Sequence, residues 1–356
     1  MKSLYMIFSI PIVFFSCSSN QDVVIPDVNL AAAVREALDL ALSDPISQKQ
    51  LEELEQLNAG EKGIKDITGL EKATGLKVLK LYENEILDIT PITGLTQLTE
   101  LILYDNQISD ITPIAGLTQL TTQLYLGRNQ ISDITPFANL KQLKELEIGQ
   151  NQISDITPLA NLKQLKVLHL YENQISDVKP LKALTQLEKL NIGKNQISDF
   201  SPLSNLPQIS SLYLYNNHIK DLSALVGLKS LRSLLLDHNQ IRDIKPIEKL
   251  PQLTYLTLQD NQISNIKPIA TLHKLTGLML DRNQISDVTP CSELTQIQEL
   301  YLSKNQIRDV TPLENLTHLT DLWIKDNPIQ DMEPIRKLLK QNKNLDLDIG
   351  TPSQEN

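Results

Sequence analysis

The sequence predicts a curved α/β solenoid, with a parallel sheet along the concave side and short 3-10 or helical arcs along the convex side. Three observations support this fold class. An Asn recurs every 22 residues, with a single step of 23; a Leu-x-Leu or Leu-x-Ile pair precedes each Asn; and most units have an Asp and a Pro after it. Because a solenoid adds coils side by side without starting new cores, we expect one elongated domain.

The repeated Asn marks twelve units that share one template. Within one unit, Leu168 and Leu170 alternate with the period of a strand, so both point inward and the residue between them faces outward. The amide of Asn173 both donates and accepts, and stacked copies are expected to form a ladder that satisfies buried backbone groups. These residues are Asn84, Asn106, Asn129, Asn151, Asn173, Asn195, Asn217, Asn239, Asn261, Asn283, Asn305 and Asn327.

The second half of each unit is expected to return along the convex side. Asp177 can cap the first free amides of a helical turn, and Pro180 suits the start of such a turn but excludes a strand. Each coil then buries its Leu and Ile against its neighbours. About thirteen coils, at a strand spacing of roughly 4.8 Å, give an arc on the order of 60 Å. The step of 23, at residues 120–124, is interpreted as a local bulge.

Both ends of the solenoid need caps, because terminal coils would otherwise expose their core. Residues 26–63 are predicted to form a helical N-terminal cap, with a first helix that Asp27 caps and a second helical stretch over 47–57. Repeats follow over 64–332. Residues 333–356 are expected to provide a C-terminal cap, with a helix after Pro334 and an edge strand over 345–349, and a frayed tail from 350.

The composition argues against several classes of function. A net charge of −10 repels phosphate backbones, so nucleic acid is not expected as a partner. Two Cys, at positions 17 and 291, cannot build a disulfide scaffold or a thiolate metal site, and the five His form no ligand set. The chain shows no catalytic constellation or phosphate-binding Gly loop. We therefore expect a protein that is not an enzyme and needs no cofactor or metal.

Residues 1–16 differ from the rest and read as a signal peptide. Lys2 precedes an apolar run from Leu4 to Phe15, which is too short to span a bilayer. Ser16-Cys17 at its end resembles a bacterial lipobox, although Phe14 stands where that motif usually has Leu. The resemblance implies a lipid on Cys17, a tether over 17–25 and, with Ser18 next, the outer membrane if the cell has one. The alternative is ordinary cleavage and secretion, with Cys17 incidental.

Aromatic residues gather on the outward positions of the predicted strands. Eight of the nine Tyr and the only Trp fall there, and such side chains are enriched at binding surfaces. The simpler alternative is that Tyr favours exposed strand positions. The candidate partner-binding residues are Tyr82, Tyr104, Tyr125, His169, Tyr171, Tyr213, Tyr215, Tyr255, Tyr301 and Trp323.

Charge also divides the predicted concave face. Its first half is acidic and its middle is basic, so a basic partner would be steered to the first half; a solvated surface that serves only solubility is the alternative. The acidic residues are Glu83, Glu100, Asp105, Glu145, Glu147 and Glu172, and the basic ones are Lys189, Lys194, Arg232 and His238.

The coil Asn-Gln-Ile-Ser-Asp-Ile-x-Pro-Leu-x-x-Leu resembles the 22-residue leucine-rich repeats of bacterial internalins and of a eukaryotic phosphatase-regulating family. The resemblance covers about residues 64–349 and implies the fold; the partner depends on the variable concave residues. Together with the predicted signal peptide and the aromatic concave face, the resemblance leads us to expect an exported, monomeric scaffold that binds a protein or glycan. The alternative is an intracellular regulatory subunit that binds an enzyme such as a phosphatase.

Overall fold

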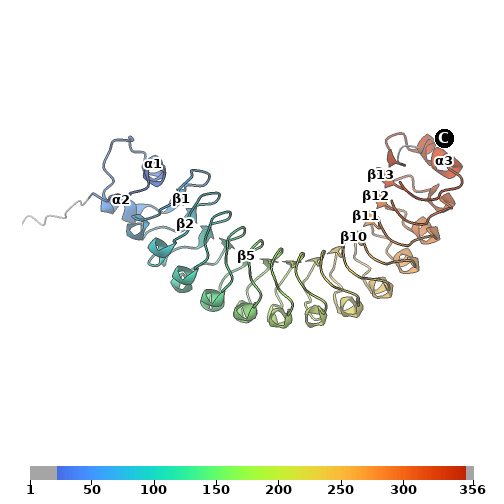
Figure 1. Ribbon diagram of the computed structural model, residues 1–356, viewed down its shortest axis with the longest axis horizontal. Helices are drawn as coiled ribbons and strands as arrows, with labels where there is room; N and C mark the ends of the chain where they lie inside the picture. Colours follow the sequence, from blue (N-terminus) through green and yellow to red (C-terminus); the bar gives the residue numbers. More distant parts are fainter. Residues whose placement is uncertain (1–21, 350–356) are drawn as a thin grey trace, which may run out of the picture.

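The computed structural model describes residues 22–349, which form a single curved solenoid (Figure 1). Fourteen parallel strands follow one another in chain order in one sheet. The sheet lines the inside of the arc, and the return segments lie on the outside. The predicted signal peptide, Cys17 and the tail from residue 350 lie outside the described residues. The predicted fold class is confirmed.

The described elements have the following bounds. The helices are α1 Val28–Ala37, α2 Gln48–Glu53 and α3 Glu333–Gln341. The strands are β1 Gln56–Asn58, β2 Val78–Lys80, β3 Glu100–Ile102, β4 Gln123–Tyr125, β5 Glu145–Glu147, β6 Val167–His169, β7 Lys189–Asn191, β8 Ser211–Tyr213, β9 Ser233–Leu235, β10 Tyr255–Thr257, β11 Gly277–Met279, β12 Glu299–Tyr301, β13 Asp321–Trp323 and β14 Asp346–Asp348. The 3-10 turns are η1 Leu70–Lys72, η2 Thr90–Ile92, η3 Thr112–Gly116, η4 Thr135–Asn139, η5 Thr157–Asn161, η6 Lys179–Ala183, η7 Ser201–Leu203, η8 Ser223–Gly227, η9 Lys245–Lys249, η10 Lys267–Thr271, η11 Thr289–Glu293 and η12 Thr311–Leu313.

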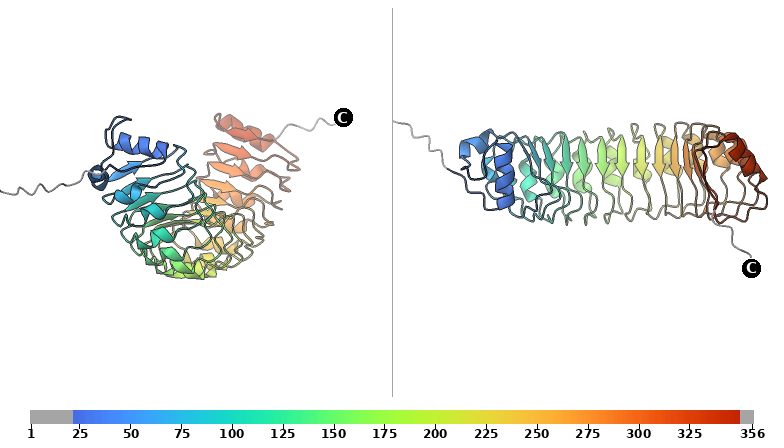
Figure 2. Two further views of the ribbon diagram at one scale, coloured as in Figure 1. Left: turned by 60° about the vertical axis from the view of Figure 1, so that its left-hand side comes forward. Right: turned by 90° about the horizontal axis from the view of Figure 1, so that it is seen from above.

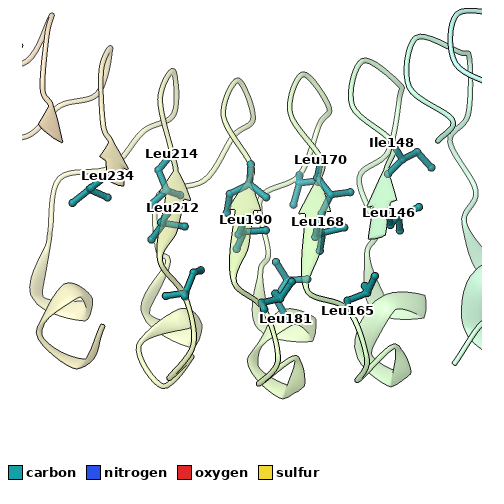
Figure 3. Packing of buried hydrophobic residues seen from close by; sticks show 14 of the residues in the cluster. Leu146, Ile148, Leu165, Leu168, Leu170, Leu181, Leu190, Leu212, Leu214 and Leu234 are labelled. Carbon is teal, nitrogen blue, oxygen red and sulfur yellow. The ribbon is translucent and has the colours of Figure 1, made fainter. Parts of the chain in front are cut away.

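The core is one continuous layer between the sheet and the convex turns. In β6, Leu168 is the middle residue of the strand and Leu170 follows its end; both have no exposed surface. Leu168 pairs in register with Leu146 on one side and Leu190 on the other. Figure 3 shows these side chains stacked from coil to coil. The period-two alternation predicted for the Leu-x-Leu pair is confirmed.

The Asn ladder is present as predicted. The Nδ2 of Asn173 donates to the carbonyls of Leu170 in its own coil and Ile148 in the preceding one, both at 3.1 Å. Its Oδ1 accepts from the N–H of Ile153 at 2.9 Å. Each Asn thus joins two coils and satisfies backbone groups that the core would otherwise leave without partners.

The convex turns follow the predicted capping chemistry. Asp177 Oδ1 accepts the N–H of Lys179 at 2.9 Å, and Pro180 lies in the first turn of η6. Leu181 points from the same turn into the core with no exposed surface. Because Pro has a fixed φ and no N–H, this side of the coil forms a helical turn and not a second sheet.

The N-terminal cap differs from the prediction in one element. Asp27 caps α1 as expected, accepting the N–H groups of Asn29 and Leu30 at 2.9 and 3.0 Å. The second helical stretch ends at Glu53, however, and residues 56–58 form β1, the first strand of the sheet. The prediction of a helix through residue 57 is wrong, and the sheet has fourteen strands instead of about thirteen.

The step of 23 residues does not disturb the sheet. The additional residue lies just before β4, where the N–H groups of Thr121 and Thr122 both donate to the carbonyl of Thr99 at 3.2 Å. Leu124 still pairs in register with Leu101 and Leu146. The bulge is therefore outside the strand, and the concave side chains of β4 keep the same alignment as their neighbours.

At the C-terminal end, α3 lengthens the last convex arc and β14 adds the final strand, as predicted. Pro334, in the first turn of α3, and Ile335 and Leu338 are buried against the last coil. Figure 2 shows that α1 and α3 cover opposite ends of the row of strands. The two ends of the core are thus closed by helices.

Candidate binding surface on the concave face

Each coil presents three side-chain positions to the concave side. In β5 they are Glu145 and Glu147, on either side of buried Leu146, and then Gly149 after the strand. These are called the first, second and third concave positions below. The next residue, Gln150, turns the chain with a φ of 55°. The same left-handed turn recurs before every ladder Asn, so the three positions repeat in register along the arc.

The candidate aromatic residues occupy these positions from β2 to β13. The second position holds Tyr125, His169, Tyr213, Tyr301 and Trp323; the third holds Tyr82, Tyr104, Tyr171 and Tyr215; the first holds Tyr255. All are partly buried except Trp323, which is 38% exposed. The structure thus places all ten on one face but spreads them along the arc.

Four of the Tyr rings lie against a Gly of a neighbouring coil. A Cβ atom on Gly149 would come within 2.5 Å of the ring of Tyr171, so the ring packs directly on the glycine backbone. Four of the eight concave Tyr therefore have a packing role in addition to any role in binding. The sequence could have predicted this contact, because each of these Tyr has a Gly 22 residues away, at the matching position of an adjacent coil. The pairs are Tyr82 with Gly60, Tyr171 with Gly149, Tyr215 with Gly193 and Tyr255 with Gly277.

Two further aromatic contacts cross between coils. The rings of Tyr301 and Trp323 stack with centroids 4.1 Å apart and an interplanar angle of 6°. The guanidinium of Arg128 lies 5.9 Å from the centroid of the Tyr104 ring. Such contacts hold planar surfaces in fixed orientations, which lowers the entropic cost of using them for binding.

A hollow of about 230 Å³ opens on the concave face between β4, β5 and β6. It is lined by Tyr125, Glu145, Leu146, Glu147, Val167 and His169, and is called the acidic hollow below. Val167 supplies apolar surface, Tyr125 and His169 contribute rings from the flanking strands, and Leu146 is buried beneath the hollow with its side chain in the core. The sequence placed Tyr125 and His169 among the candidate binding residues but did not predict a hollow between them.

The two carboxylates of the acidic hollow are held by neutral donors. Glu145 Oε2 accepts from the hydroxyl of Tyr125 and from Nε2 of Gln123, both at 3.1 Å. Glu147 accepts from the N–H of Gly127 at 3.0 Å through Oε2 and from that of Gly149 at 3.1 Å through Oε1. These bonds fix the carboxylates in place without neutralising their charge.

Burial shifts the titration of these groups. It raises the pKa of Glu147, and hydrogen bonds from Gly149, Gly127 and Tyr171 offset this only in part. Burial and the hydrogen bond to Glu145 raise the pKa of Tyr125 to about 12. The pKa of His169 is lowered by burial and by the charge of Lys189, against the influence of Glu145. At neutral pH the imidazole is therefore neutral.

Two family models match the chain. A model for leucine-rich repeats in two copies matches residues 96–139, 122–161, 163–205, 229–270 and 295–337, which together exceed half of the chain, and a second leucine-rich-repeat model matches 185–241 and 251–307. The chain belongs to the leucine-rich-repeat family. Proteins of this architecture offer extended concave surfaces for binding.

Solved structures of other leucine-rich-repeat proteins share the arc. An internalin, InlF of Listeria monocytogenes, is 34% identical with a TM-score of 0.89, and the match covers 94% of this chain and 100% of that one. The functional domain of InlJ from the same species is 28% identical over 93% and 72%, with a TM-score of 0.76. A leucine-rich-repeat protein of Leptospira interrogans is 26% identical over 85% of each chain, with a TM-score of 0.74. A search of the curated proteins gives no match.

Several charges of the predicted acidic half are paired between coils of the leucine-rich-repeat arc. Glu100 forms an ion pair with Lys80 at 2.8 Å, Asp105 pairs with Arg128 at 2.9 Å, and Glu172 pairs with Lys194. Opposite charges one coil apart therefore lie side by side and compensate part of the predicted acidic half. Of the six acidic residues, Glu83, Glu145 and Glu147 form no ion pair within residues 22–349, and the last two line the acidic hollow.

The basic middle is also weaker than expected. Lys194 is paired with Glu172, and Nδ1 of His238 lies 3.5 Å from Oδ2 of Asp260. Arg232 lies before β9, outside the three concave positions. Lys189 remains at the first position of β7. Charge on the concave face therefore varies from coil to coil and not between two halves.

Other candidate chemistry is limited in the described residues. Cys291 is fully buried, and burial raises the pKa of its thiol to about 12, as expected for a core residue. No group of three or more His, Cys, Asp or Glu within residues 22–349 is placed to hold a metal ion. Over the same residues, no helix has the length and apolar character needed to cross a membrane.

Proposed function

We propose that this leucine-rich-repeat protein is a non-catalytic scaffold that binds another protein through its concave face. The observation that carries the proposal is the acidic hollow, where ring, apolar and carboxylate groups converge at fixed positions on that face. The arc around it adds Tyr213 and the stacked pair Tyr301 and Trp323 as rigid aromatic contacts. A glycan is the alternative ligand.

We also propose that the protein acts at the cell envelope as a monomer. The support is the sequence of residues 1–17, with a short apolar run that ends in Ser16-Cys17. A lipid on Cys17 would attach the arc to the envelope, at the outer membrane where one exists; cleavage without lipidation would secrete it. The mass of the N-terminal peptide from membrane fractions decides between them, and an intact Met1 terminus in the cytoplasm would favour the intracellular regulator.

The binding surface is tested by photo-cross-linking with the full chain in cells that produce it. A photoreactive phenylalanine analogue replaces Tyr213 or Trp323 on the concave face, and Val226 on the convex turn η8 serves as the control position, being 43% exposed. The expected result is a specific protein adduct from the two concave positions only. Equal adducts from all three positions, or from Val226 alone, would show that the concave face is not the binding surface.

A further inference from the structure

We infer that the acidic hollow binds one basic side chain of the partner protein, with the guanidinium of an arginine as the preferred group. The inference rests on the proposed function and makes it more specific. It assigns a chemical identity to the group that fills the hollow and names Glu145 and Glu147 as the residues that select it.

The shape and chemistry of the acidic hollow require a ligand with two parts. Val167 offers apolar surface, while the two carboxylates lie on the same strand on either side of buried Leu146. Arginine and lysine match this arrangement, because each has a methylene stem that packs on apolar surface and a head that only donates hydrogen bonds. An aliphatic side chain would leave the carboxylates buried without a counter-charge.

The charge of the two carboxylates is not compensated within the protein. Neither Glu145 nor Glu147 forms an ion pair with a Lys, Arg or His among residues 22–349. Glu145 uses Oε2 for both of its hydrogen bonds, and its Oε1 accepts none from the described residues. An acceptor is therefore available to an incoming donor. Burial, together with the charge of Lys189 in the next strand, lowers the pKa of His169, so the neutral imidazole does not repel a cation.

Three other carboxylates on the concave face are satisfied within the protein. Asp237 binds the N–H of Gln259 through Oδ1 and the hydroxyl of Thr257 through Oδ2, so both oxygens are used. Glu100 and Glu172 have Lys partners. The free Oε1 and uncompensated charge of Glu145 thus distinguish it from these three carboxylates, whereas Glu147 has both oxygens bonded and contributes its charge.

Arginine is favoured over lysine by the rings of Tyr125 and His169. A guanidinium is planar, is weakly hydrated, stacks on aromatic faces and reaches two carboxylates with separate N–H groups. An ammonium head is compact and strongly hydrated, so it gains less from the ring walls. The preference follows from the pairing of aromatic and carboxylate groups in one hollow.

The test uses a capped pentapeptide with a central Arg between Gly residues, and a control peptide in which citrulline replaces the Arg. Citrulline keeps the shape and removes the charge. Binding to the full mature protein is followed through the ring signal of His169 in histidine-labelled NMR spectra, assigned by its loss in His169→Gln. We expect the Arg peptide to shift this signal with a Kd of roughly millimolar and the citrulline peptide to bind at least about tenfold more weakly.

Variants identify the groups responsible. Glu145→Gln and Glu147→Gln are each expected to weaken binding of the Arg peptide at least about fivefold. Glu299→Gln is the matched control, because Glu299 holds in β12 the first concave position that Glu145 holds in β5, and it should leave binding unchanged. Unchanged signals from the other His residues show that each variant keeps the fold.

The results separate this inference from the proposed function. If the Arg and citrulline peptides bind alike, or if Glu299→Gln weakens binding as much as the hollow variants, the acidic hollow does not select a cation. Cross-links from Tyr213 and Trp323 would still support protein binding in that case. Conversely, selective binding of the Arg peptide without concave cross-links would leave a cation site but remove the proposed scaffold function.

Discussion

Strands β4–β6 and strands β9–β12 both bury carboxylates on the concave face, but Glu145 in the first region is satisfied differently from Asp237 and Asp281 in the second. In the second region Asp237 and Asp281 accept N–H groups from the next coil, at 2.9 Å from Gln259 and 2.8 Å from Ser303. Both oxygens of Asp237 are used in this way. In the first region, Glu145 keeps one oxygen free in the acidic hollow. The same scaffold thus uses carboxylates for cohesion between coils in one place and exposes one to a ligand in another.

The largest expected loss of stability comes from replacing ladder Asn residues, and it tests whether the ladder supports both regions equally. Asn173→Ala near the first region and Asn261→Ala in the second each remove an amide that bonds buried backbone groups of two coils. Since one unsatisfied buried group costs about 1–3 kcal/mol, each variant should lower the free energy of unfolding by about 3 kcal/mol or more. Urea denaturation measures this, with exposed Gln174→Ala as the control. A much smaller effect at one site would mean that the ladder is not equivalent along the arc.

The second prediction concerns the glycines under the Tyr rings. Gly149→Ala places a methyl group within 2.5 Å of the Tyr171 ring, whereas a methyl at Gly94 meets nothing within 4 Å. We expect Gly149→Ala to lower stability by about 1–3 kcal/mol and to displace Tyr171 from beside Glu147, and Gly94→Ala to be neutral. Thermal unfolding of the two variants is the measurement. Equal melting temperatures would contradict the packing role of the ring.

The third prediction uses pH to compare the two regions. Burial raises the pKa of Glu147 above its ordinary value of 4.5 and that of Asp237 above 3.8, so each carboxyl favours protonation more in the folded state than in the unfolded state. The stabilisation that results is complete at pH values below the ordinary pKa of the carboxyl. It is lost as the pH rises through the raised pKa of the folded state. Relative to Glu147→Gln or Asp237→Asn, the wild-type protein should therefore become less stable between acidic and neutral pH.

Adding the Arg peptide distinguishes the pH dependence at Glu147 from that at Asp237. A bound Arg peptide should reduce the pH effect at Glu147, because a cation favours the ionised carboxylate, and should leave that at Asp237 unchanged. Urea denaturation at several pH values, with and without the peptide, measures both. An equal response at the two positions would contradict the placement of the bound cation beside Glu147.

The smallest effect is expected for the ion pairs between coils. Lys194→Ala removes the partner of Glu172, but both side chains are partly exposed, so the loss of stability should be about 0.5 kcal/mol or less and should diminish in salt. Unfolding at low and high ionic strength checks this. A loss above about 1 kcal/mol that persists in high salt would show that the pairing is part of the scaffold.

Most of the coil was predictable because its determinants are local and repeated. A single unit already shows the spacing of the apolar residues and the residues that cap the turn. The structure places all of them as predicted: Leu168, Leu170, Asn173, Asp177 and Pro180. The strand β1 was not predicted because its segment matches the repeat pattern only in part. Its Leu57 is followed by Ala59 instead of a second Leu, and no ladder Asn follows. A short segment with one large apolar residue does not distinguish a strand from the end of a helix.

The candidate binding surface was predictable only in part. The periodicity placed Tyr125, His169 and Trp323 on the concave face, because side-chain direction in a strand follows from residue parity. The sequence also showed which residues were charged, but not which charges would meet. Glu172 and Lys194 are 22 residues apart, and their pairing depends on the alignment of two separate coils.

The sequence by itself determined the curved sheet, the ladder and the face on which variable residues lie, since each follows from a pattern within about one repeat. Tertiary structure decided how side chains of adjacent coils share the surface: Tyr171 on Gly149, Lys80 beside Glu100, and the acidic hollow beside Glu145. These features depend on side-chain length and on register across the sheet. Both are set only when the coils stack, because the contacting groups come from different strands.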